Sequence, residues 1–146
     1  MTPMPQRMLI ASQPFGPRLG AERVARAIAT GFEQAGRPRA DLLALPADSG
    51  PEDVREQLDA AGFDARMRQA RAVVIACARL HERALAGSAA FEIATRARQG
   101  GVPAYAVTAE NALDAFDARM LDLQLIVQAT GARALAAAGR RLASVV

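Results

Sequence analysis

Short apolar runs alternate along the chain with longer segments in which apolar residues recur every three or four positions. Runs of the first kind predict β-strands, because a strand buried on both faces needs no polar residue on either side. The run at 71–78, RAVVIACA, is the clearest example. The predicted strands are 7–12, 40–46, 71–78, 102–108 and 123–130.

Segments of the second kind predict amphipathic helices between these strands. In the first, Val24, Ile28 and Phe32 share one face, and Gly36 follows as a residue suited to ending a helix. Pro51 begins the second, and acidic residues occupy its first turn. The predicted helices are 21–35, 51–61, 87–99, 113–120 and a last one from Gly131 onward.

This alternation favours a single doubly wound α/β fold: a mostly parallel, five-stranded, Rossmann-like sheet with helices on both faces. Right-handed connections then bring the carboxyl ends of all the strands to one edge of the sheet. Ligands of such sheets bind at that edge, at the place where the strand order reverses. The residues of interest therefore follow the strands: Ser12, Gln13, Asp48, Ser49, residues 77–83 and Thr108.

Length and apolar content set the broad class of the protein. A chain of 146 residues that is 51% apolar is suited to one globular domain, so we expect residues 1–146 to form a single domain. The first apolar stretch, Met8 to Ala11, is too short for a secretory signal. No apolar run approaches the roughly 18 residues of a membrane helix. We therefore expect a cytoplasmic protein without a membrane partner.

The basic residues are unusual, since all 18 are arginines and the chain has no lysine. This excludes chemistry that needs a lysine amine, such as the phosphate-binding lysine of a P-loop or a Schiff base. The net charge of +3 comes from arginines that alternate with acids, as in Glu22-Arg23 and Arg55-Glu56. Because the arginines form no run, we expect no nucleic-acid partner.

Two interpretations stay open for the polar residues at the predicted edge. Gly87 and Ser88 begin a helix, so they form either an anion site or only an N-cap. Asp48 either binds Mg²⁺ or accepts a proton, or it only turns the chain and caps a helix. Arg18 and Arg79 either bind a phosphate or carboxylate through their guanidinium groups or are simply solvated.

Cys77 and His81 are the only cysteine and the only histidine of the chain. Two such ligands do not hold zinc, so we expect no metal site of this kind. Cys77 ends an apolar run, which favours an inert core cysteine over a nucleophile activated by His81. His81 is either a surface residue or a catalytic one.

Three motifs give the chain a resemblance to the bacterial two-domain glycerate kinases of the glycerate 2-kinase type. Residues 10–19, IASQPFGPRL, are similar to the family motif I-A-P-D-S-F-K-G-S-L, and residues 47–52, ADSGPE, to A-D-G-G-E-G. Residues 74–88, VIACARLHERALAGS, resemble V-I-T-G-E-G-R-L-D-x-Q-S-L-x-G-K with one residue fewer before Arg79. The resemblance implies a Rossmann-like larger domain, glycerate as substrate, and ATP and Mg²⁺ as cofactors.

The chain departs from this family at its charged positions. Gln13 and His81 stand where the family has aspartates, and Gly16 and Ser88 stand where it has lysines. The second domain of the family is missing near residues 60–62. Because phosphoryl transfer depends on positioning and on stabilisation by metal ions and cations, we expect the kinase activity to be lost or vestigial.

The leading hypothesis is therefore a catalytically degenerate relative that binds a small anion or a nucleotide at the edge of the sheet. Its candidate catalytic residues are Asp48, Arg79 and His81, and its candidate ligand-binding residues are Gln13, Arg18, Gly50, Gly87, Ser88 and Thr108. Two alternatives stay open. One is an active ATP-dependent glycerate kinase completed by oligomerisation, and the other is a non-enzymatic interaction module that forms a homodimer.

Overall fold

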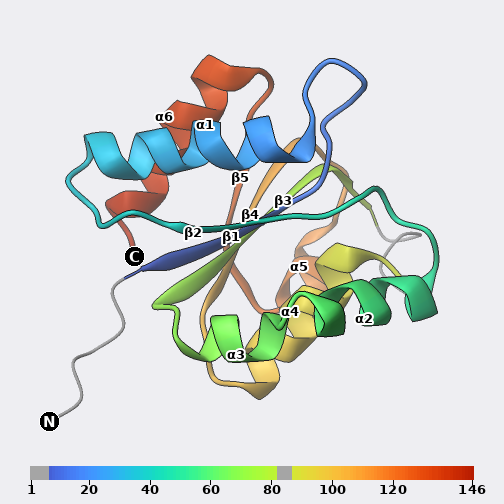
Figure 1. The fold of residues 1–146 in the computed structure, drawn as a ribbon. Helices are drawn as coiled ribbons and strands as arrows, with labels where there is room; N and C mark the ends of the chain where they lie inside the picture. Colours follow the sequence, from blue (N-terminus) through green and yellow to red (C-terminus); the bar gives the residue numbers. More distant parts are fainter. Residues whose placement is uncertain (1–6, 82–86) are drawn as a thin grey trace, which may run out of the picture.

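The computed structural model describes residues 7–81 and 87–146. Within these residues five strands form one all-parallel sheet in the order β2-β1-β3-β4-β5, which confirms the predicted fold class (Figure 1). The strands are β1 (Met8–Ser12), β2 (Asp41–Ala44), β3 (Ala72–Leu80), β4 (Ala104–Asn111) and β5 (Leu123–Gln128). The order reverses between β1 and β3, so the switch point lies at the carboxyl ends of these two strands.

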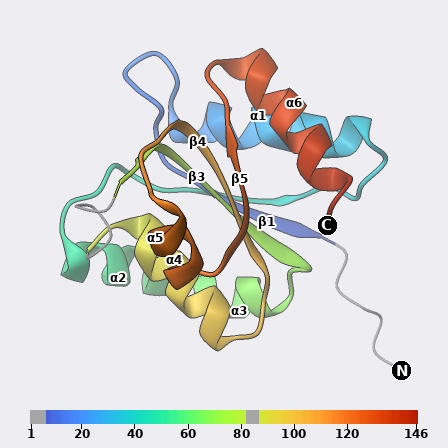
Figure 2. The same ribbon diagram turned by 180° about the vertical axis from the view of Figure 1, so that it is seen from behind.

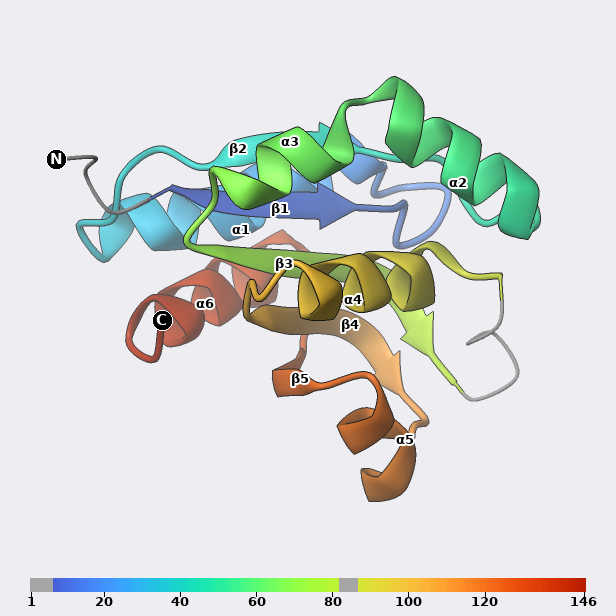
Figure 3. The ribbon, with the colours of Figure 1, turned by 90° about the horizontal axis from the view of Figure 1, so that it is seen from below.

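Helices cover both faces of the sheet, as predicted (Figures 1 and 2). One face carries α1 (Ala21–Gln34) and α6 (Ala132–Ala143). The other face carries α2 (Pro51–Ala60), α3 (Phe63–Arg68) and α4 (Ala89–Gln99). The short α5 (Ala115–Met120) lies on the side of α4, at the β5 end of the sheet (Figure 3).

The central strands have continuous apolar sequences because both of their faces are buried. Side chains alternate between the two faces of a strand. In β3, Val73 and Ile75 enter the core beneath α2, α3 and α4, whereas Val74 enters the core beneath α1 and α6. All three side chains are at most 2% exposed. A polar residue at any of these positions would be buried on one side or the other.

Two local features differ from the sequence prediction. The helix α3 was not predicted; Phe63 and Met67, one helical turn apart, bury its inner face. Strands β3 and β4 are also longer than predicted, because Arg79 and Leu80 continue the pairing opposite Glu110 and Asn111. Leu80 is 3% exposed, so its burial favours extending the strand. Arg79 therefore lies in a strand and not in a loop.

The turn between α2 and α3 lies where the resemblance places the missing second domain. Gly62 takes the left-handed conformation there, with φ +67°, and α3 begins at the next residue. That residues 1–146 form a single domain stays a prediction. No helix among the described residues is long and apolar enough to span a membrane.

Candidate functional site

The structure joins Asp48 directly to two other elements at the carboxyl edge of the sheet. Asp48 Oδ1 accepts a hydrogen bond from Gln13 Nε2 at 2.8 Å and another from the backbone N–H of Ala89 at 2.9 Å. Gln13 Nε2 also donates to the carbonyl of Pro46 at 3.0 Å. Asp48 thus links the end of β1, the loop after β2 and the first residue of α4.

Strand order explains this junction. Strand β1 lies between β2 and β3, so Gln13, directly after β1, lies between the loop that follows β2 and the helix that follows β3. The backbone N–H of Gln13 donates to the carbonyl of Ala76 in β3 at 2.8 Å, which fixes its position. Gln13 is 8% exposed. Its side-chain amide bonds the loop after β2 and its backbone N–H bonds β3, so the residue bridges two strands that are not neighbours in the sheet.

The beginning of α4 already has two internal acceptors. Ser88 is the N-cap, and its Oγ accepts from the N–H of Phe91 at 3.0 Å. The Asp48 carboxylate accepts from the N–H of Ala89, one position further on. A helix N-terminus carries free N–H groups and a partial positive charge, which attract an anion. In this chain a carboxylate of the protein itself occupies that position.

Two glycines permit the close approach of the loop after β2 to α4. Gly87 has φ +92°, and a Cβ atom there would lie 3.1 Å from Cδ of Pro51. Gly50, the N-cap of α2, has φ +111°. Because such φ values strain any residue with a side chain, both predicted ligand-binding glycines have a structural reason to be present. Ligand binding by either glycine stays a prediction.

The other predicted site residues make no contact with this junction among the described residues. Arg79 pairs with Glu110 of β4 at 3.3 Å, and both side chains are more than half exposed. Thr108 is fully buried in β4, and its hydroxyl donates to the carbonyl of Glu110 at 3.1 Å. Arg18 is exposed in the loop before α1, and His81 directly follows β3. The structure therefore brings Gln13, Asp48, Gly87 and Ser88 together but does not join Arg18, Arg79, His81 or Thr108 to them through any described contact.

Cys77 is buried in β3 and is a free thiol. Burial, opposed by its hydrogen bond with Thr108, raises the pKa of the Cys77 thiol to about 12, and the nearby Asp48 carboxylate adds to the rise. A thiol with such a pKa is protonated at neutral pH and is a poor nucleophile. This agrees with the prediction of an inert core cysteine. Residues 82–86, which include part of the predicted site region, lie outside the described residues.

Several groups at the carboxyl edge of the sheet were missed at the sequence level. They are the carbonyl of Pro46, the N–H of Ala89 and the ring of Pro51, together with Glu110 as the partner of Arg79. The first two are backbone groups, which no motif of side chains announces. Among the described residues, no three His, Cys, Asp or Glu side chains are grouped so as to hold a metal ion.

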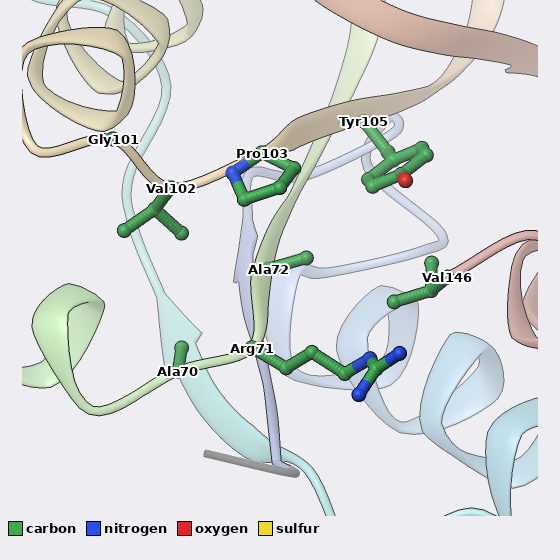
Figure 4. A pocket seen from close by; sticks show the side chains of 8 residues that line it. All are labelled: Ala70, Arg71, Ala72, Gly101, Val102, Pro103, Tyr105 and Val146. Carbon is green, nitrogen blue, oxygen red and sulfur yellow. The ribbon is translucent and has the colours of Figure 1, made fainter. Parts of the chain in front are cut away.

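A hollow of about 350 Å³ lies at the opposite edge of the sheet, at the amino ends of β3 and β4 (Figure 4). Its lining includes Arg71, Pro103, Tyr105 and Val146. None of the predicted site residues lines it. Its position is the wrong one for the predicted site, because ligands of parallel sheets bind at the carboxyl ends of the strands.

The fold and the junction define the class of the molecule: a Rossmann-like α/β protein of strand order 2-1-3-4-5 with a side-chain carboxylate placed at the switch point. No family model and no curated protein sequence matches the chain.

Solved structures do resemble it. A protein described as pilus assembly-related, from Burkholderia pseudomallei, is 22% identical, with 99% of this chain and 94% of that chain covered and a TM-score of 0.49. A protein described as glycerate kinase 2, from Salmonella typhimurium, is 14% identical at a TM-score of 0.47. The match covers 73% of this chain but only 27% of that kinase. Likeness at these identities concerns the fold alone, and kinship with the glycerate kinases stays a prediction.

Proposed function

We propose that the chain is a non-enzymatic α/β module that acts through contact with another protein. The observation that carries this proposal is the position of Asp48. Its carboxylate lies at the N-terminus of α4, which is where the leading hypothesis would put a phosphate or a substrate carboxylate. An incoming anion would meet a negative charge there, which opposes its binding.

Several of the polar groups that would have to bind substrate are engaged in internal contacts. Gln13 is bonded to Pro46 and Asp48, and Arg79 is paired with Glu110. Catalysis requires groups directed at the reacting atoms and preorganised around them. Here the described hydrogen bonds preorganise the loops around each other. This arrangement supports a structural role for the carboxyl edge of the sheet. The proposed function, contact with another protein, then belongs to the surface of the module.

Substitution of Asp48 separates the structural role from the catalytic one. If the carboxylate joins Gln13 to α4, Asp48→Ala lowers the free energy of unfolding by about 1–2 kcal/mol, because two hydrogen-bond donors lose their acceptor. Asp48→Asn retains most of the stability, since its amide oxygen can accept the same bonds. Ser49→Ala, in the same exposed loop, is the matched control and stays within about 0.5 kcal/mol of the wild type.

The same proteins are titrated with ATP and Mg²⁺, and with glycerate, by calorimetry and thermal shift. We expect no heat of binding and no change in Tm. A ligand that bound only the native state would raise the stability of that state and therefore its Tm. Magnesium-dependent ATP binding that Asp48→Ala abolishes, with stability unchanged, would overturn the proposal in favour of the kinase.

A further inference from the structure

The two outer strands of the sheet differ in how their free edges are protected. At the β2 edge, Arg66 of α3 binds Asp41 through two hydrogen bonds of 2.7 and 2.9 Å. The same guanidinium donates to the carbonyl of Leu42 at 2.9 Å. The edge of β2 is thus short, charged and partly capped by a side chain, which are features that discourage pairing with another strand.

The β5 edge lacks such protection. Strand β5 has the sequence LQLIVQ, with neither a charged residue nor a proline. Within the described residues it pairs only with β4, so its outer side faces no other strand. Leu123, Leu125 and Ile126 are only partly buried. An uncharged apolar edge strand of six residues offers free backbone donors and acceptors to another strand.

Helix α5 adds apolar surface at the same end of the sheet (Figure 3). None of its residues is buried. Phe116 and Met120 are 64% and 58% exposed, and their spacing of four residues places them on one side of the helix. Strand β5 and helix α5 thus both carry apolar side chains that are exposed or only partly buried at this end of the sheet. Exposed apolar side chains that gather on one side of a molecule are typical of an interaction site.

The absence of charge on β5 favours a second copy of this chain as the partner. A two-fold interface brings a patch against the same patch of the other copy, so a strand with charges of one sign would meet charges of that sign. In an antiparallel pair of β5 strands, the end at Gln124 of one copy lies near the end at Gln128 of the other. Both residues are exposed and neutral, so this pairing contains no like charges along the strand.

We propose that two copies of the chain pair through β5 in antiparallel orientation, which joins their sheets into one continuous sheet. The two-fold axis is perpendicular to the sheet, so both α5 helices lie on the same face and flank the axis with Phe116 and Met120. This inference rests on the proposed function, since it names the partner of the module.

Charge reversal at the two ends of β5 tests the pairing. The double variant Gln124→Arg/Gln128→Arg places arginines near one another at both ends of the paired strands. The double variant Gln124→Glu/Gln128→Arg places a glutamate near an arginine instead. Both replace the same two exposed residues and lose the same bond from Gln128 Nε2 to the carbonyl of Ala109. They therefore form a matched pair that differs in the sign of one charge.

Sedimentation equilibrium measures the dimer dissociation constant, and thermal unfolding checks that each variant folds. We expect a dimeric wild type, a dissociation constant raised about tenfold or more in the double-arginine variant, and a value near the wild type in the Glu/Arg variant. Phe116→Ser/Met120→Ser should weaken the dimer as well, through loss of apolar contact.

Three outcomes would overturn this dimer. They are a wild type that stays monomeric at about 200 µM, near the weak end of specific association; a dimer that the double-arginine variant leaves intact; and equal weakening by both charge variants. A monomer that also fails to bind ATP or glycerate would refute the pairing but leave the non-enzymatic function standing. Binding of ATP or glycerate by an intact dimer would refute the non-enzymatic function but leave the pairing standing.

Discussion

The two helix layers are held together by opposite means. On one face, α1 and α6 meet through glycines, so that backbone touches backbone at Gly31 and Gly139. On the other face, the guanidinium of Arg96 bonds carboxylates of α2, α3 and α4. The first kind of contact depends on shape and tolerates no added atom, whereas the second depends on charge and can be replaced in part by water.

The glycine contact is the tighter of the two. A Cβ atom built at Gly31 would collide with the carbonyl oxygen of Ala136 and lie 2.9 Å from the Cα of Gly139. A Cβ atom at Gly139 would collide with the carbonyl oxygen of Ile28. Backbone atoms cannot rotate out of the way as side chains can. Any substituent at these two positions must therefore push the helices apart.

The polar contact spans three helices. Arg96 of α4 bonds Asp59 of α2 at 2.8 Å, Asp64 of α3 at 3.2 Å and Glu92 of its own helix at 3.1 Å. The Arg96 side chain is 13% exposed, whereas those of Asp59 and Asp64 are 68% and 49% exposed. Solvent screens the carboxylates on their outer sides, so each pair contributes modestly. The comparison predicts that added volume costs more than lost charge in this molecule.

The largest expected effect is therefore that of Gly31→Ala or Gly139→Ala. We expect each to lower the free energy of unfolding by about 3 kcal/mol, at the upper end for overpacking. Alanine is the better helix former by about 1 kcal/mol, so intrinsic propensity alone would predict the opposite sign. Chemical denaturation of purified variants measures the difference.

The control for this prediction is Gly20→Ser at the N-cap of α1. Gly20 has φ −72°, and a Cβ atom there meets nothing within 4 Å. A serine suits an N-cap, so we expect a change within about 0.5 kcal/mol. If Gly31→Ala were as stable as Gly20→Ser, the two helices would not be in backbone contact, and the contrast between the layers would disappear.

A structural feature can be predicted from the sequence when it depends on residues that are close together in the chain. The apolar runs and the helical spacing of apolar residues were enough to predict all five strands and the helices α1, α2, α4, α5 and α6, because periodicity is a local signal. Gly31 and Gly139 interrupt helical patterns, which hints at close packing, but no local signal pairs two residues so far apart in the chain. The short α3 was missed because six residues carry too little periodicity.

The candidate site was predicted in part for the same reason. Its position at the carboxyl edge follows from parallel strands, and Gln13 and Asp48 were both among the candidates. That they bond each other could not be predicted, because the contact depends on β1 lying between β2 and β3. The role of the Ala89 N–H was equally hidden, since a backbone group leaves no trace in the sequence.

A smaller effect is expected for Arg96→Gln, about 1–2 kcal/mol. The substitution leaves three neighbouring carboxylates without their cation, but two of them are well solvated. Arg98→Gln on the same helix is the matched control, because Arg98 is exposed and, within residues 7–81 and 87–146, donates only to the carbonyl of Met120 at 3.2 Å. Equal losses from the two substitutions, measured by urea denaturation, would contradict a joining role for Arg96.

The smallest expected effect is the pH dependence that the ion pair of Asp41 and Arg66 gives to the free energy of unfolding. Hydrogen bonds from Arg66 lower the pKa of the Asp41 carboxyl below its usual range. A carboxyl with a lowered folded pKa stabilises the protein above its unfolded pKa of about 3.9, and that contribution disappears as the pH falls through the folded pKa. Both side chains are about 30% exposed, so the contribution is about 1 kcal/mol or less.

Wild type and Asp41→Asn are therefore compared by urea denaturation at steps from pH 6 down to pH 3. The difference in their free energies of unfolding should be constant near pH 6 and shrink below about pH 4, where protonation removes the charge that Asn lacks already. All other carboxyl groups are common to both proteins and cancel in the difference. Arg66→Gln should flatten the profile in the same way, because it removes the donor that lowers the pKa. A difference that stays constant down to pH 3 would mean that Asp41 has the same pKa in the folded and the unfolded chain. The ion pair of Asp41 and Arg66 would then not stabilise the protein through charge.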